Sequence, residues 1–198
     1  LVLTALAASP SPTRAERRAR AGALLASAVA LMALLFGGLG GVHRGARPWP
    51  FLVGTALGWA LLAAAALAGV FHRGGSMLAP SRRRLILLIV GCPLVAFAWT
   101  LLWNGIYPST LQPWPGRVGW RCLGLTLLLA AWPLLAFVLV KRSSTIHNPG
   151  YLGTACGIAV AAGAGLLISL YCPIADPAHT AVGHILPFVI LGAAGCTI

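Results

Sequence analysis

The chain has 198 residues, of which 59% are hydrophobic and 8% are charged, and it carries a formal net charge of +12. Soluble domains average roughly 25% charged residues, so this chain cannot cover a soluble globule with polar surface and belongs to the membrane class. A strongly basic chain invites a nucleic-acid interpretation. Its basic residues, however, fall in short joints between apolar runs. Direct nucleic-acid binding is therefore not expected.

Residues 1–20 form a basic segment ahead of the first apolar run. Leu3 and Leu6 fall on one side of a short helix, which the Ser-Pro-Ser-Pro sequence at 9–12 interrupts. Thr13 and Glu16 have the spacing of a capping box, so a helix is expected to restart there. We treat residues 1–20 as an N-terminal arm, separate from a membrane domain that covers residues 21–198.

Six apolar runs without internal charge follow, at residues 21–42, 49–71, 85–103, 122–140, 152–172 and 177–198. Each has about the 17 to 25 residues that a helix needs to cross the hydrocarbon core. A backbone in lipid must satisfy its own hydrogen bonds, so the runs should be helical. The sequence predicts an all-α membrane protein with a bundle of six transmembrane helices. Gly153 and Gly157, with GxxxG spacing, are interpreted as a packing contact inside this bundle rather than a dimer contact.

The basic joints predict the orientation. With the N-terminus inside, ten Lys and Arg residues lie in the inner segments and four in the outer joints. Basic residues favour the cytoplasmic side, so both termini are predicted to be cytoplasmic. Trp49, Trp103 and Trp120 then fall at outer helix ends, where amphipathic rings belong. We expect a multi-pass protein of the bacterial inner membrane.

Residues able to carry catalysis are scarce. Glu16 and Asp176 are the only carboxylates, and they lie in different parts of the chain, so they cannot form a catalytic pair. No Ser, His and Asp set has a suggestive spacing. The chain is therefore not expected to be an enzyme, and no cofactor is expected beyond a possible metal ion at the outer face.

The last outer joint concentrates polar groups. Asp176-Pro177 has the pattern of a helix start, with Asp as N-cap and Pro in the first position. His179 follows closely, whereas His184 lies about 140° further around a regular helix. The two imidazoles are therefore not expected to chelate one ion from one face. Two interpretations stay open: a capped helix in which Asp176 orients a histidine, or a metal site completed by Cys172 or another helix.

The five cysteines show no zinc-finger spacing. Cys92, Cys156 and Cys196 lie inside apolar runs and are interpreted as small packing residues. Cys122 begins the fourth run and Cys172 ends the fifth, both at the predicted outer face. They are either a redox or soft-metal pair or two unrelated buried thiols.

At these residues the chain resembles the NrsF-type membrane anti-sigma factors of bacteria. The similarity lies in Trp120-Arg121-Cys122 with Pro133, in Cys172-Pro173 followed by Asp176, and in the N-terminal Leu-Ala-Ala-Ser-Pro segment before the arginines. Family members often carry more acidic and aromatic residues in the joint after the second cysteine, where this chain has His179 and His184.

The resemblance implies a six-helix regulator that holds an extracytoplasmic-function sigma factor through its cytoplasmic arm. An oxidative or metal signal at the outer face would release the factor. The residues expected to sense the signal are Cys122, Cys172, Asp176, His179 and His184, and those expected to bind the partner are Leu3, Leu6, Arg14, Arg17 and Arg18. A small multi-pass transporter and a metal-binding membrane protein are the alternatives.

Overall fold

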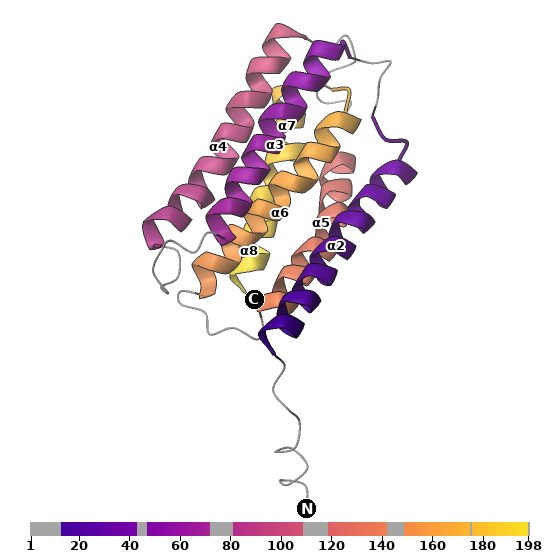
Figure 1. The fold of residues 1–198 in the computed structure, drawn as a ribbon. Helices are drawn as coiled ribbons and strands as arrows, with labels where there is room; N and C mark the ends of the chain where they lie inside the picture. Colours follow the sequence, from indigo (N-terminus) through magenta and orange to yellow (C-terminus); the bar gives the residue numbers. More distant parts are fainter. Residues whose placement is uncertain are drawn as a thin grey trace, which may run out of the picture.

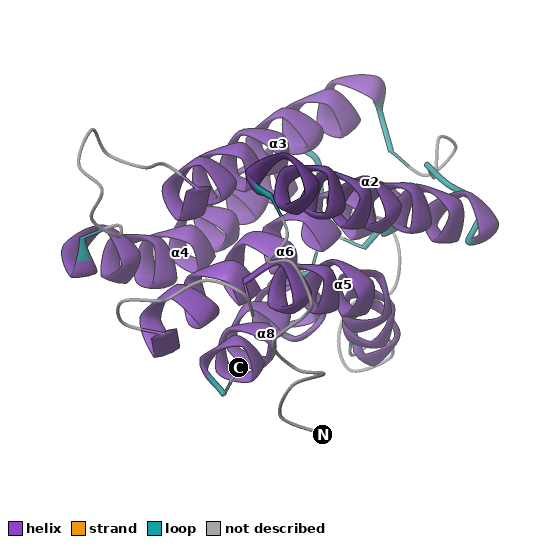
Figure 2. Ribbon diagram, turned by 60° about the horizontal axis from the view of Figure 1, so that its bottom comes forward, coloured by secondary structure: helices purple, strands orange, loops and turns teal. Residues whose placement is uncertain are grey.

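The computed structural model describes residues 13–42, 47–71, 81–108, 119–141, 149–174 and 176–197, and every regular element among them is a helix (Figure 2). The elements are α2 (Arg14–Gly38), α3 (Trp49–Phe71), α4 (Arg82–Ile106), α5 (Trp120–Lys141), α6 (Pro149–Tyr171), α7 (Pro177–Thr180), a π-helix η1 (Ala181–Ile185) and α8 (Leu186–Cys196). Because α7, η1 and α8 form one continuous rod, the described residues contain six helical units that are long and apolar enough to span a membrane. This confirms the prediction of an all-helical fold with six helices of spanning length.

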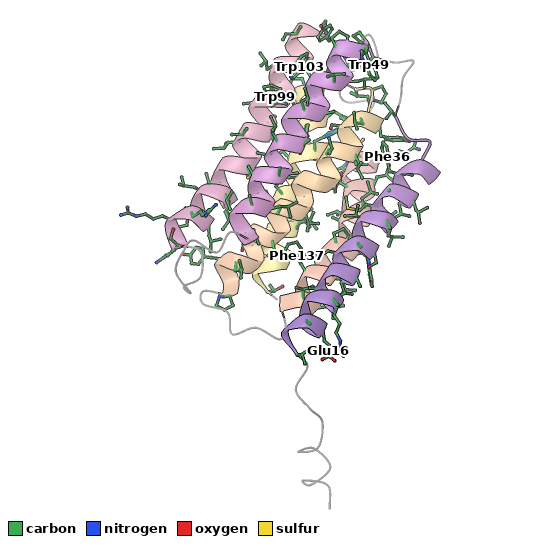
Figure 3. All side chains as sticks on the ribbon, in the orientation of Figure 1. Glu16, Phe36, Trp49, Trp99, Trp103 and Phe137 are labelled. Carbon is green, nitrogen blue, oxygen red and sulfur yellow. The ribbon has the colours of Figure 1, made fainter. Side chains whose placement is uncertain are left out.

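The six units run alternately up and down (Figure 1). We call the end where α2, α4 and α6 begin the arm end, because the N-terminal arm leads into α2 there. The opposite end, where α5 begins and α6 ends, is called the cluster end. Figure 3 places Glu16 at the arm end and Trp49 and Trp103 at the cluster end. Trp49 and Trp120 are mostly exposed at the cluster end, which fits interfacial rings.

The bundle is organised around α6. In its span 72% of the residues are buried, against 6% in the span of α2. Helix α6 packs against α3, α4, α5 and α8, whereas α2 lies at the edge of the bundle along α5 (Figures 1 and 2). The core therefore lies on both sides of α6, and α2 is its least attached element.

Glycines on α6 explain its close contact with α8. A Cβ atom at Gly153 would lie 1.9 Å from the carbonyl oxygen of Gly195, and one at Gly157 would lie 2.0 Å from that of Leu191. Such distances are impossible for real side chains, so only glycine lets the two backbones approach this far. The prediction that the GxxxG row packs inside the bundle is confirmed.

The N-terminal helix begins where the capping box predicted. The Thr13 hydroxyl accepts from the amide of Glu16, and the Glu16 carboxylate accepts from the amide of Thr13. From Arg14 the helix continues without interruption into the first span, so the predicted division at residue 20 falls inside α2. Arg14, Arg17 and Arg18 belong to the first turns of α2, whereas Leu3 and Leu6 lie outside the described residues.

Candidate functional site: a cysteine and histidine cluster

Four buried side chains meet at the cluster end, and we call them the Cys-His cluster: Cys122, Cys172, His179 and His184. Each offers one sulfur or nitrogen atom, and these atoms all lie within 4.8 Å of one another. Cys122 comes from the start of α5, Cys172 follows the last residue of α6, and the two histidines come from α7 and η1. Three separate parts of the chain therefore converge on one point.

Cys172 is positioned by the end of α6. Its amide donates to the carbonyl of Ile168 at 2.8 Å, as in one more helical turn. Pro173 then has no amide hydrogen, so the helical ladder stops there. The Cys172 Sγ lies 3.2 Å from Nε2 of His179. The end of α6 therefore places the Cys172 sulfur next to His179.

Asp176 acts as the N-cap of the last helix rather than as a member of the cluster. Its carboxylate accepts from the amide of His179 at 2.8 Å, and Pro177 occupies the first turn. This confirms the predicted Asp-Pro helix start. Asp176 therefore fixes the backbone of His179, while the imidazole of His179 is held at Cys172 on the other side.

The π-helix corrects the expected geometry of the two histidines. Regular helical spacing predicted that they would not chelate one ion from one helix face without Cys172 or a group from another helix. Their ring centroids lie only 5.8 Å apart, and Cys172 and Cys122 join them in one group. A π-turn closes over five residues instead of four, and the Leu186 amide accordingly bonds to the carbonyl of Ala181. Pro187 favours this irregularity, because it cannot donate to the carbonyl of Gly183 and its ring would crowd that carbonyl.

Two glycines allow α5 to reach the π-turn. Gly119 has a φ of +91°, and a Cβ atom there would lie 2.8 Å from the carbonyl oxygen of His179 and 3.0 Å from the amide nitrogen of Gly183. At Gly183 a Cβ would lie 3.0 Å from that of Cys122. This backbone contact places Cys122 beside both histidines. Sequence reasoning did not single out Gly119, because its neighbours in space are about 60 residues away in the chain.

Arg47 is a buried cation beside the cluster that the sequence suggested only as a topology marker. Its Nε donates to the carbonyl of Pro173 at 2.9 Å, and its Nη1 donates to the carbonyl of Tyr107 at 2.5 Å. The guanidinium also lies 4.5 Å from the ring centroid of Phe51. Burial lowers the pKa of Arg47, and the neighbouring Cys172 opposes that shift. Arg47 therefore ties the joint after α6 to α3 and α4.

The cluster favours the thiolate form of Cys172. A hydrogen bond from Cys122 lowers the pKa of Cys172 below the usual range of a thiol; burial opposes this effect, and contacts with His179 and His184 reinforce it. A thiolate is the form of cysteine that attacks disulfides and binds metals. Two sulfur and two imidazole donors also form a set that suits zinc or copper ions.

The family model for the negative regulator of sigma F, NrsF, matches residues 4–198. The chain belongs to the NrsF family. No match was found among curated proteins or among solved structures. The match confirms the resemblance seen in the sequence and implies a regulator whose partner is a sigma factor.

The remaining cysteines of this NrsF-family chain lie elsewhere. Cys92 and Cys156 are buried, as expected of packing residues. Cys196 is exposed, so the packing interpretation was wrong for that residue. It occupies the last position of α8, beside the start of α6, where a Cβ atom at Gly150 would lie 3.4 Å from its Sγ. Among the described cysteines, the cluster thus holds the two that lie beside histidines.

Proposed function

We propose that this protein is an integral inner-membrane anti-sigma factor. In this proposal the cytoplasmic arm, residues 1–20, holds an extracytoplasmic-function sigma factor, and a redox or metal signal at the Cys-His cluster releases it. The observation that carries the proposal is the convergence of four metal- and redox-active side chains at the end opposite the arm. Membership of the NrsF family supplies the sigma factor as the partner class.

The distribution of charge supports the orientation that this function needs. Arg20 and the arginines that begin α4 lie at the arm end, which the excess of basic residues makes cytoplasmic. The cluster then faces the periplasm, where disulfides persist and metal ions arrive first. On the inner side, Leu3 and Leu6 would enter an apolar groove of the partner as one face of a helix, and Arg14, Arg17 and Arg18 would contact acidic groups around it.

Two chemical events would change the cluster. In the oxidative one, the sulfurs of Cys122 and Cys172 form a bond of about 2.05 Å; the two thiols together lose two electrons and two protons to an oxidant such as diamide, which becomes the hydrazine. In the metal event, one thiophilic cation binds the two sulfurs at about 2.3 Å and the two imidazoles at about 2.0 to 2.1 Å. The Nδ1 atom of His184 is buried without a hydrogen-bond partner among the described residues, so a ligand at this nitrogen would remove an unfavourable state.

Helix α5 offers a route from the cluster to the arm. Cys122 lies in its first turn, and Trp132 lies about 15 Å further along the same helix. The Trp132 indole donates to the hydroxyl of Ser27 on α2 at 3.2 Å. Because α2 continues from Arg14 into the first span, a displacement of α5 is passed to the helix that carries the arm.

Retention of the cognate sigma factor on membranes tests the proposal. Deletion of residues 1–12 keeps the capping box of α2 and should release the factor into the soluble fraction. Replacing Arg14, Arg17 and Arg18 with serine should weaken retention in the same way. Sigma binding that persists in both variants would refute the assignment of the arm.

A second set of variants separates the two signals. Cys122→Ser and Cys172→Ser should keep the sigma factor bound in the presence of either diamide or zinc. His179→Ala should abolish the response to zinc but leave the response to diamide, because a disulfide needs no imidazole ligand. Cys156→Ser, a buried thiol of α6 outside the cluster, is the matched control and should respond to both. Normal release from the Cys172→Ser variant would refute the sensing role.

A further inference from the structure

A groove opens at the arm end, far from the Cys-His cluster. Its volume is about 520 Å³, and it lies between the starts of α4 and α6 and the end of α8. Its lining is mostly apolar and consists of Ile89, Pro149, Gly150, Tyr151, Thr154 and Cys196. The Thr154 hydroxyl donates to the carbonyl of Gly150 at 2.8 Å, so its methyl group is the part left to line the groove.

The groove reaches the depth of lipid tails. Ile89 is seven residues beyond the start of α4 and Thr154 five beyond the start of α6. At 1.5 Å per residue, these side chains lie about 10 Å and about 7 Å below the ends of the spans. A soluble protein segment would have to enter the hydrocarbon layer to fill this space, whereas an acyl chain is already there.

The mouth of the groove carries an ordered positive charge. The Nη2 of Arg82 donates to the Tyr151 hydroxyl at 2.6 Å, and the guanidinium lies 4.9 Å from the centroid of the Tyr151 ring. Arg82 is exposed, as is Arg83 next to it. Because Tyr151 also lines the groove, this contact places the cation beside it, at the level where headgroups lie.

The side-chain carboxylates of this chain do not neutralise that charge. Glu16 and Asp176 are the only acidic residues in the sequence. Glu16 lies at the foot of α2, across the bundle from α4 (Figures 1 and 3), and accepts from the Thr13 amide. Asp176 caps α7 at the opposite end. The ligand that suits this site therefore brings its own negative charge.

We propose that this groove binds an anionic phospholipid, with its phosphate at Arg82 and Tyr151 and one acyl chain between α4, α6 and α8. The two parts of the site require one molecule with an anionic head and an apolar tail. Inorganic phosphate could bind the cation at the mouth but would leave the apolar groove unfilled. A neutral lipid could fill the groove but would leave the cation at the mouth without an anionic partner. Basic pockets between helices on the cytoplasmic side are suited to such headgroups.

Native mass spectrometry of the full chain, taken from nanodiscs of phosphatidylcholine with or without phosphatidylglycerol, tests the proposal. The wild type should retain phosphatidylglycerol in preference to phosphatidylcholine, and inorganic phosphate should not displace it. Arg82→Gln should lower the retained phosphatidylglycerol about tenfold, because it removes the cation that pairs with the phosphate. Ile89→Trp, which fills the groove but keeps the charge, should lower it as well.

Arg121→Gln is the matched control. It removes the same charge and a similar contact, because Arg121 donates to the Tyr171 hydroxyl at 3.0 Å at the cluster end, whereas the groove lies at the arm end. Equal loss of lipid from the Arg82 and Arg121 variants would overturn the proposal. So would unchanged phosphatidylglycerol retention in the Arg82 variant together with loss of sigma factor binding, because the groove would then be a protein docking site.

Discussion

Gly119→Ala should disrupt the Cys-His cluster without changing any of its four side chains. The new methyl group would lie 2.8 Å from the carbonyl oxygen of His179 and 3.0 Å from the amide nitrogen of Gly183. Both are backbone atoms, so no side chain can move aside. The start of α5 must instead separate from the π-turn, and this movement takes Cys122 away from both histidines.

The expected magnitude follows from two costs. Gly119 has a φ of +91°, and a left-handed conformation costs an L-residue roughly 1–2 kcal/mol. Overpacking against fixed neighbours adds about 1–3 kcal/mol. The sum is about 2–5 kcal/mol, and each 1.4 kcal/mol corresponds to a tenfold change in an equilibrium constant. Metal affinity at the cluster should therefore fall at least about tenfold.

Cobalt binding provides the assay, because thiolate-to-cobalt charge transfer absorbs where the apoprotein does not. The purified protein in detergent is titrated with Co²⁺, and its melting temperature is recorded in the same buffer. The control is Gly124→Ala on the same helix, where nothing lies within 4 Å of the added methyl group. Equal cobalt affinity in the two variants would refute the argument that backbone contact at Gly119 holds the cluster together.

Three further predictions concern other contacts. Gly157→Ala should lower the melting temperature, because its methyl group would meet a backbone carbonyl of α8. Gly163→Ala should not lower it, because the nearest atom to the added methyl group is 4.0 Å away. Equal melting curves for the two variants would contradict this. Arg47→Met should destabilise the fold by about 3–6 kcal/mol, because it loses two hydrogen bonds to a charged group at roughly 1.5–3 kcal/mol each. In thermal melts, Arg47→Lys should restore only part of this stability. Cys122→Ala removes the hydrogen bond that lowers the pKa of Cys172, so the pH dependence of Cys172 labelling by iodoacetamide should shift to higher pH. Cys122→Ser keeps a hydrogen-bond donor and should shift this pH dependence less. Identical pH profiles for the wild type and the Cys122→Ala variant would contradict the contact.

Much of the fold followed from local sequence properties. Six uncharged apolar runs of spanning length are almost sufficient to specify six helices, because lipid leaves the backbone no other hydrogen-bond partners. The start of the last helix was equally local, since Asp176 and Pro177 carry out the capping within one turn. The contact made by Gly157 was predictable because its spacing with Gly153 is that of a helix interface.

The candidate site was predicted in composition but not in geometry. Regular α-helical spacing separates His179 from His184, and only the π-turn before Pro187 brings them together. The turn also lies against the backbone of Gly119, which directly precedes α5. Arg47 was not recognised for the same reason: the carbonyls it binds are 60 and 126 residues away in the chain. Periodicity along one helix contains no information on such partners.

The peripheral place of α2 has a consequence for the order of assembly. Helix α2 is synthesised first, yet α5, along which it packs, follows only after two further spans. The other spans gather around α6, which is completed later still. During synthesis α2 must therefore remain in the lipid until α5 offers it a surface. The helix that carries the arm is made before the helix it packs on, and its departure would leave the packing around α6 intact.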